Sequence, residues 1–95
     1  MKTTVEKNYK KLFSLGFKRK NIEVKDDPTS GWMEKKININ EFKGKLYYDG
    51  RFALMEIEIY PDVSSKNKIF EVVWVGSFKE LLIKNKKYGK TKNKN

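Results

Sequence analysis

The chain has no cysteine and no histidine among its 95 residues. Without cysteine it forms no disulfide, no thiolate metal site and no cysteine nucleophile. Without histidine it lacks the usual imidazole ligand of zinc and the commonest general base. Because most catalytic and metal-binding signatures are excluded, we expect a protein that is not an enzyme and that uses no cofactor or metal.

Long apolar runs are missing as well. No segment approaches the roughly 20 apolar residues that a membrane-spanning helix needs. The first residues, MKTTVEKNYKK, lack the apolar stretch of a secretory signal. We therefore expect a cytoplasmic protein that has no membrane partner.

The composition allows one small domain. Hydrophobic residues make up 38% of the chain, which suffices for a core, so the 36% of charged residues do not indicate disorder throughout. Only the last six residues are purely polar, built from lysine, threonine and asparagine. The sequence predicts a single domain over residues 1–89 and a disordered basic tail over residues 90–95.

Positive charge is abundant and unevenly distributed. The net charge is +10, and only two of the 22 basic residues are arginine. Residues 1–20 carry a net +6, residues 81–95 another +6, and residues 21–80 a net −2. A genome rich in A and T raises the lysine content of a chain everywhere, so it does not account for a neutral middle between two basic ends.

Capping signals predict a helix at each end of the domain. Thr3 with Glu6 has the spacing of a capping box, and Gly16 suits the end of the first helix. Ser77 with Glu80 repeats the capping spacing before the second helix. The inward-facing residues are expected to be Val5, Tyr9, Leu12 and Phe13 in the first helix, and Phe78, Leu81 and Leu82 in the second.

Alternating apolar residues between the helices predict antiparallel strands. These cover residues 17–25, 32–40, 45–48, 51–60 and 69–75. Asp49-Gly50 is a strong hairpin signal, and a two-residue loop would place Tyr48 opposite Arg51. The last strand is apolar on both faces apart from Glu71, which is typical of an interior strand. The fold class is therefore α+β, with a meander of four to five strands and both helices packed on one face.

The central hairpin has two unlike faces. The expected core face carries Leu46, Ala53, Met55, Ile57 and Ile59. The other face combines aromatic and acidic residues, and five aromatic residues form a possible partner face: Tyr47, Phe52, Tyr60, Phe70 and Trp74. Such a face suits a protein partner or a homodimer contact, because its glutamates would repel the phosphates of a stacked strand.

Two carboxylate patterns resemble catalytic arrangements. Metal-dependent nucleases hold Mg²⁺ with two acids followed by Glu-x-Lys, and the matching residues here are Glu23, Asp27, Glu34 and Lys36. A chance Glu-x-Lys is expected in a chain so rich in lysine, and Glu41-Phe42-Lys43 is another. Glu56 and Glu58 share a strand face without a neighbouring nucleophile. We interpret both patterns as surface charge.

The basic ends are the main functional candidates. Their side chains are Lys7, Lys10, Lys11, Lys18, Arg19, Lys20, Lys84, Lys86, Lys87 and Lys90. Lysine contacts phosphates as a point charge, whereas arginine forms the bidentate fork that reads guanine. We therefore expect a small nucleic-acid-binding accessory protein, of the kind encoded by phages and plasmids, that contacts the DNA or RNA backbone. The alternative is a protein-binding module or inhibitor that uses the aromatic and acidic sheet face.

Overall fold

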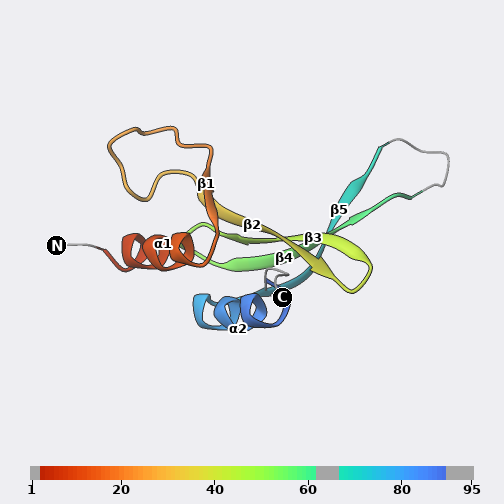
Figure 1. The fold of residues 1–95 in the computed structure, drawn as a ribbon. Helices are drawn as coiled ribbons and strands as arrows, with labels where there is room; N and C mark the ends of the chain where they lie inside the picture. Colours follow the sequence, from red (N-terminus) through yellow and green to blue (C-terminus); the bar gives the residue numbers. More distant parts are fainter. Residues whose placement is uncertain (1–2, 62–66, 90–95) are drawn as a thin grey trace.

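The computed structural model describes residues 3–61 and 67–89. The elements in chain order are α1 (Thr4–Ser14), β1 (Lys18–Lys20), β2 (Trp32–Ile39), β3 (Phe42–Tyr48), β4 (Ala53–Ile59), β5 (Ile69–Gly76) and α2 (Phe78–Tyr88). The five strands form one antiparallel meander in the order β1-β2-β3-β4-β5, and the helices pack on one face of it (Figure 1). The predicted α+β class and architecture are confirmed.

The core lies between the two helices and one sheet face, which we call the helix face. The buried apolar side chains are Tyr9, Leu12, Phe17, Met33, Ile37, Leu46, Tyr48, Ala53, Met55 and Leu81. The sheet register places Met33, Tyr48 and Ala53 in one row across β2, β3 and β4. On the opposite side, which we call the open face, no helix packs among the residues that the structure describes. Phe13, expected in the core, is 71% exposed, so the buried stripe of α1 is narrower than predicted.

Local signals at the ends of α1 direct the chain as expected. The Thr3 hydroxyl accepts a hydrogen bond from the Glu6 amide at 3.1 Å. Gly16 has a φ of +95°, and the Phe17 amide donates back to the Leu12 carbonyl at 3.0 Å. This is a Schellman ending, in which the residue after the glycine packs on the last turn. It buries Phe17 against Leu12 and leads the chain directly into β1.

The first strand is much shorter than predicted. Only Lys18–Lys20 pair with β2, and the chain leaves the sheet at Asn21, whose φ is +53°. The amides of Glu23 and Val24 donate to the Ser30 hydroxyl instead of to a neighbouring strand. The prediction of a strand to residue 25 was wrong. The Ser30 hydroxyl accepts the hydrogen bonds of backbone amides that the apolar alternation had assigned to pairing between strands.

The register of the central hairpin also differs from the prediction. Tyr48 pairs with Ala53 rather than with Arg51, so the loop has four residues and not two. The Asp49 carboxylate accepts hydrogen bonds from the amides of Arg51 and Phe52 and so stabilises the longer loop. The shift is two residues, which keeps every side chain on its expected face because the side-chain period of a strand is two.

The position of β5 contradicts its sequence pattern. Its composition predicts an interior strand, yet β5 is the last strand of the meander and pairs with β4 alone. Five of its large apolar side chains remain exposed: Ile69, Phe70, Val72, Val73 and Val75. Strand pairing in a meander follows chain order, and no later strand exists among the described residues to cover this edge.

Candidate nucleic-acid interface

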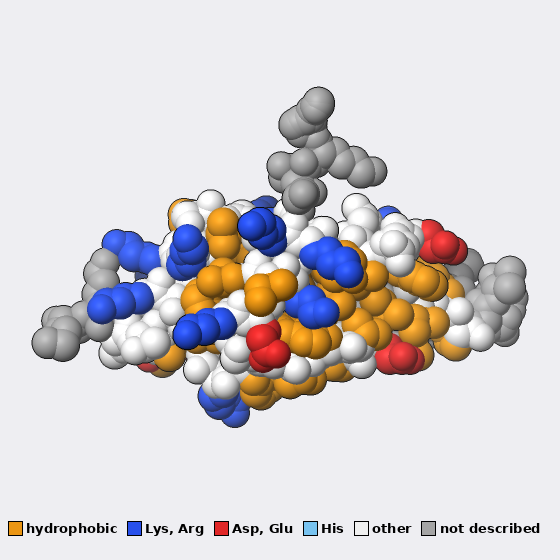
Figure 2. Space-filling model, turned by 90° about the horizontal axis from the view of Figure 1, so that it is seen from below, with side chains coloured by type: hydrophobic (Ala, Val, Ile, Leu, Met, Phe, Trp, Pro, Cys, Tyr) orange, Lys and Arg blue, Asp and Glu red, His pale blue; other side chains and the backbone are white. Residues whose placement is uncertain are grey.

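The lysines of the two helices lie on the same side of the sheet. Together α1 and α2 carry seven lysines and two glutamates. The lysines are Lys7, Lys10 and Lys11 in α1, and Lys79, Lys84, Lys86 and Lys87 in α2. Figure 2 views the molecule from this side and shows basic side chains gathered over one half, with apolar side chains toward the other end. We call these seven residues the helix lysines.

The acidic side chains of the described residues do not neutralise the helix lysines. Glu6 and Glu80 lie in the first turns of the helices, where the helix dipole stabilises a negative charge. Glu80 is also hydrogen-bonded in the Ser77 capping box. The ion pairs found within residues 3–61 and 67–89 are all elsewhere: Lys45 with Glu34 and Glu56, Arg51 with Asp49, and Lys68 with Glu58. The helix side therefore keeps an uncompensated positive charge.

Two helix lysines cover aromatic rings of the core side. The Lys84 ammonium lies 5.5 Å from the centroid of Trp74, and the Lys87 ammonium lies 5.2 Å from that of Tyr88. These cation–π contacts hold the stems against apolar surface while the charge stays accessible. Lys90 belongs to the tail 90–95, which lies outside the described residues.

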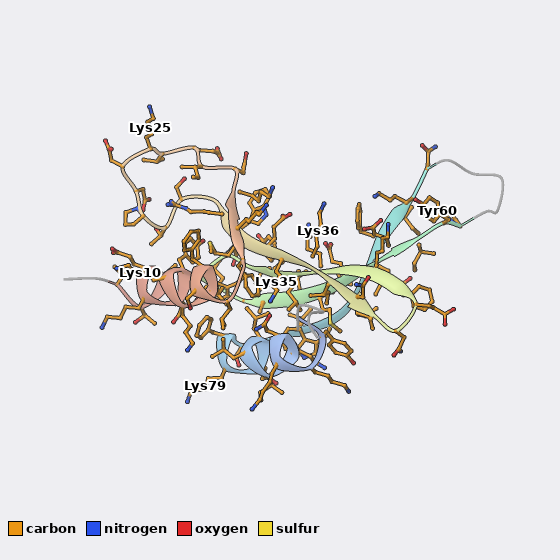
Figure 3. All side chains as sticks on the ribbon, in the orientation of Figure 1. Lys10, Lys25, Lys35, Lys36, Tyr60 and Lys79 are labelled. Atoms are coloured by element: carbon orange, nitrogen blue, oxygen red, sulfur yellow. The ribbon has the colours of Figure 1, made fainter. Side chains whose placement is uncertain are left out.

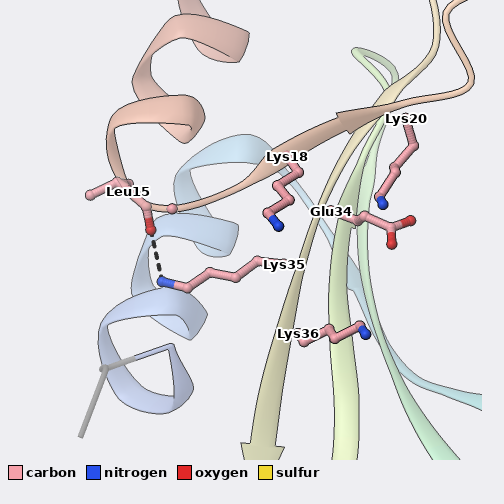
Figure 4. A pocket seen from close by; sticks show the side chains of 7 residues that line it. Leu15, Lys18, Lys20, Glu34, Lys35 and Lys36 are labelled. Carbon is pink, nitrogen blue, oxygen red and sulfur yellow. Dashed lines mark hydrogen bonds between the residues drawn. The ribbon is translucent and has the colours of Figure 1, made fainter. Parts of the chain in front are cut away.

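Lys35 joins the ends of the two helices. Its ammonium donates to the Leu15 carbonyl at 2.8 Å and to Asn85 Oδ1 at 2.9 Å (Figure 4 shows the first of these bonds). Leu15 is the C-cap of α1, and Asn85 lies in the second half of α2. Burial lowers the pKa of Lys35 from its ordinary value. The two hydrogen bonds bring the basic C-terminal turns of both helices close together. Lys35 and Asn85 are 50 positions apart in the sequence.

A pocket of about 380 Å³ lies beside this junction, at the β1 edge of the sheet. It is lined by Leu15, Gly16, Lys18, Lys20, Glu34, Lys35 and Lys36. The register places Lys18 beside Glu34, on the open face, and Figure 3 shows Lys36 pointing away from α2 while Lys35 points toward it. Lys18 and Lys20 are thus across the sheet edge from the helix lysines, and the pocket lies between the two sets. Sequence reasoning did not include Lys36 in the basic clusters. The available signal was its neighbour Lys35, which interrupts an otherwise apolar face.

Arg19 differs from the lysines around it. Its guanidinium donates to the carbonyls of Ser30 (2.8 Å) and Asp27, and it lies 5.8 Å from the centroid of Tyr9. The Asp27 carboxylate in turn accepts from Thr29, and these hydrogen bonds lower its pKa. The predicted site residue Arg19 therefore fastens the loop after β1 to α1.

The predicted aromatic face is brought together only in part. Tyr47 and Phe52 are neighbours on the open face, with ring centroids 6.3 Å apart, and Trp32 extends the row at 5.9 Å from Tyr47. Sequence reasoning missed Trp32, which precedes the predicted core residue Met33 and so belongs to the other face by alternation. Trp74 pairs opposite Met55 and lies on the helix face instead.

The open-face rings have their polar atoms satisfied. The Tyr47 hydroxyl donates to Asp49 at 3.1 Å, and the Trp32 indole donates to Glu34 at 2.9 Å. Burial, followed by the hydrogen bond to Asp49, raises the pKa of Tyr47 to about 12. Arg51 covers Phe52, with 5.6 Å from its guanidinium carbon to the ring centroid. This row is a packed part of the sheet rather than a free stacking platform.

The other two predicted aromatic residues lie farther along the open face. Phe70 is 53% exposed, and the ammonium groups of Lys45 and Lys68 lie 5.9 and 5.7 Å from its centroid. Tyr60 is 59% exposed beyond the end of β4, at the opposite end of the molecule from α1 (Figure 3). The two are separate from the row around Tyr47.

The carboxylates of the nuclease-like pattern do not assemble. Asp27 is bound to Thr29 in the loop after β1, and Glu34 is bound to Trp32 and Lys45 on β2. In the part of the chain that the structure describes, no group of three or more acidic residues is placed to hold a metal ion. Nor does either described helix have the length and apolar character needed to cross a membrane.

Comparison with known proteins identifies no relative. No family model matches the chain, and neither a curated protein nor a solved structure matches it. The proposed function therefore rests on the surface of this chain alone.

Proposed function

We propose that this chain is a small non-enzymatic protein of the cytoplasm that binds nucleic acid through the phosphate backbone. The observation that carries the proposal is the set of seven helix lysines on one side of the sheet, none of them ion-paired within the described residues. The lysines of the edge pocket extend this surface toward the open face. Neutralising several phosphates at once releases counterions, which gives strong affinity that depends little on sequence.

The arginines support backbone contact over base reading. Specific reading of guanine in the major groove relies mostly on the bidentate fork of arginine. Arg19 donates to loop carbonyls, and Arg51 pairs with Asp49 at 2.7 Å. Arg19 is thus committed to the fold, and Arg51, although its side chain is 79% exposed, already pairs with a carboxylate. Lysine ammonium groups therefore supply most of the accessible cations.

The proposal is tested by titrating binding against salt. Affinity for duplex DNA, duplex RNA and single strands is measured by fluorescence anisotropy over a series of NaCl concentrations. We expect a linear log–log plot with a slope of about −0.9 per phosphate contacted on duplex DNA. The affinity should vary little between unrelated sequences. Absence of binding to every probe at low salt would exclude the proposal.

A matched pair of charge-reversal variants locates the surface. Lys10→Glu with Lys86→Glu changes two exposed helix lysines, whereas Lys25→Glu with Lys43→Glu changes two exposed lysines of a loop and of β3. Both variants alter the net charge equally. We expect the first variant to lower the salt slope by the equivalent of about two phosphate contacts and the second to leave it near the wild-type value. Equal weakening by both would show that total charge, and not the helix lysines, drives binding.

A further inference from the structure

The strand β5 has the composition of an interior strand in the position of an edge strand. Its eight residues, IFEVVWVG, contain one charged side chain, Glu71. Phe70, Val72 and Val75 lie on the open face and are 53%, 46% and 59% exposed. Long apolar edges of this kind offer unpaired amides and carbonyls to another strand, and monomeric proteins normally avoid them.

The other edge of the sheet shows how this chain protects an edge. The strand β1 has three residues, all of them basic, and its flanking loop folds back over it through Arg19. A short strand and a row of positive charge both discourage pairing. The strand β5 is longer and carries no row of positive charge, although a register shift at Val73 interrupts its pairing with β4. The helix α2 packs mainly on β2, β3 and β4 and reaches β5 through Lys84, which lies over Trp74 on the helix face.

We propose that β5 pairs antiparallel with β5 of a second copy of this chain, which joins the two sheets into one. An antiparallel strand pairing with its own copy is self-complementary about a two-fold axis and closes after two chains. Pairing of β5 with β1 of another copy would instead continue without end, and the basic β1 edge disfavours it. A second copy therefore satisfies β5 without leaving a new edge of the same kind.

The charge distribution favours the same occupant. Between positions 68 and 78 the only charged residues are Lys68 and Glu71, so this part of a chain with a net charge of +10 is neutral. The basic residues of α1 and β1 lie at the far side of the sheet from β5 (Figure 1). Two copies thus meet through their least charged surface, and Phe70, Val72 and Val75 of each strand gain apolar neighbours on the open face. Cross-strand contacts of this kind are the main source of stability in a sheet.

The oligomeric state tests the proposal directly. Sedimentation equilibrium of the full chain at several concentrations should give twice the chain mass of 11.3 kDa. The variant Val72→Lys should shift the mass to that of one chain, since it places a lysine of each copy near the two-fold axis. Within one chain the new lysine lies opposite Glu56, so the fold is expected to persist. Circular dichroism checks this.

A matched control separates the edge from general surface charge. Val24→Lys makes the same change at a side chain that is 57% exposed in the loop after β1, and it should stay dimeric. Dissociation by Val24→Lys as well as by Val72→Lys would overturn the proposal. A wild type with the mass of one chain at every concentration would also overturn the proposal. A strand of a different protein would then be the remaining candidate to pair with β5.

Engineered cysteines test the antiparallel arrangement. Because the chain has no cysteine of its own, single cysteines at residues 69, 72, 73 and 75 report without background. A disulfide needs the two Cβ atoms about 3.5–4.5 Å apart. Two-fold pairing predicts oxidised dimers at residue 72 or 73, near the strand centre, and little at residues 69 and 75. Efficient cross-linking at all four positions would indicate parallel strands and contradict the proposal, as would none at any of them.

Discussion

At the scale of single residues, identical side-chain types have unlike roles. Lys35 and Lys36 are adjacent, yet Lys35 reaches between the helices and Lys36 points to the opposite side of β2 (Figure 3). In the sequence Lys35 only interrupts an apolar face. The folded structure shows its role, because its ammonium donates hydrogen bonds to Leu15 and Asn85. Charge alone therefore does not tell a binding lysine from a structural one.

The role of Lys35 leads to a stability prediction. Lys35→Met keeps an apolar stem but leaves the Leu15 carbonyl and Asn85 Oδ1 without this donor. We expect the free energy of unfolding to fall by about 1–3 kcal/mol, the usual cost of removing a partner from partly buried polar groups. Urea unfolding measures the change. Lys36→Met is the matched control and should unfold within about 0.5 kcal/mol of the wild type; equal stability of the two variants would disprove the role given to Lys35.

At the scale of the elements, caps and turns were predictable where local chemistry decides them. The capping residues Thr3 and Ser77 and the ending at Gly16 follow from side-chain types at fixed spacing. The length of β1 and the loop at Asp49 did not follow, because side-chain to backbone hydrogen bonds replace the expected pairing there. Such competition between polar side chains and the ladder depends on the folded loop.

Two glycines allow a comparison at this scale. Gly16 and Gly31 both have a positive φ, but a Cβ at Gly31 would lie 2.1 Å from the Lys20 carbonyl oxygen, whereas one at Gly16 meets only the end of Lys35 at 3.6 Å. We expect Gly16→Ala to cost about 1–2 kcal/mol, from the left-handed conformation alone. Gly31→Ala should cost clearly more, since backbone must also move. Thermal unfolding compares them, and a smaller loss for Gly31→Ala would contradict the observed turn.

At the scale of the whole molecule, the surplus of positive charge should be visible in stability. Charges of one sign repel each other more in the compact state than in the unfolded chain. Because added salt screens this repulsion, we expect moderate NaCl to raise the Tm by several degrees. The variant with Lys10→Glu and Lys86→Glu should show a smaller rise, because it removes part of the repulsion. A Tm that falls with salt would indicate that attractive ion pairs dominate the surface.

The shape of the molecule also separates its two proposed surfaces. The chain measures 51 × 33 × 23 Å, with the basic helix ends near the β1 edge and the neutral strand β5 at the other edge. Binding of nucleic acid through the helix lysines and pairing of two copies through the β5 edge therefore use different faces, which adjoin at Lys84 over Trp74. A variant at β5 is expected to change the mass of the particle without removing the helix lysines from any single copy.

The sequence by itself determined the class of the fold, the two capped helices, the faces of the strands and the basic character of both ends. These follow from periods of two and 3.6 residues and from local capping chemistry. Only the tertiary structure decided that Lys18 and Lys20 lie across the sheet edge from the helix lysines, that Arg19 and Lys35 are structural, and that β5 is an edge. These depend on which distant segments meet, and spacing along the chain carries no record of that.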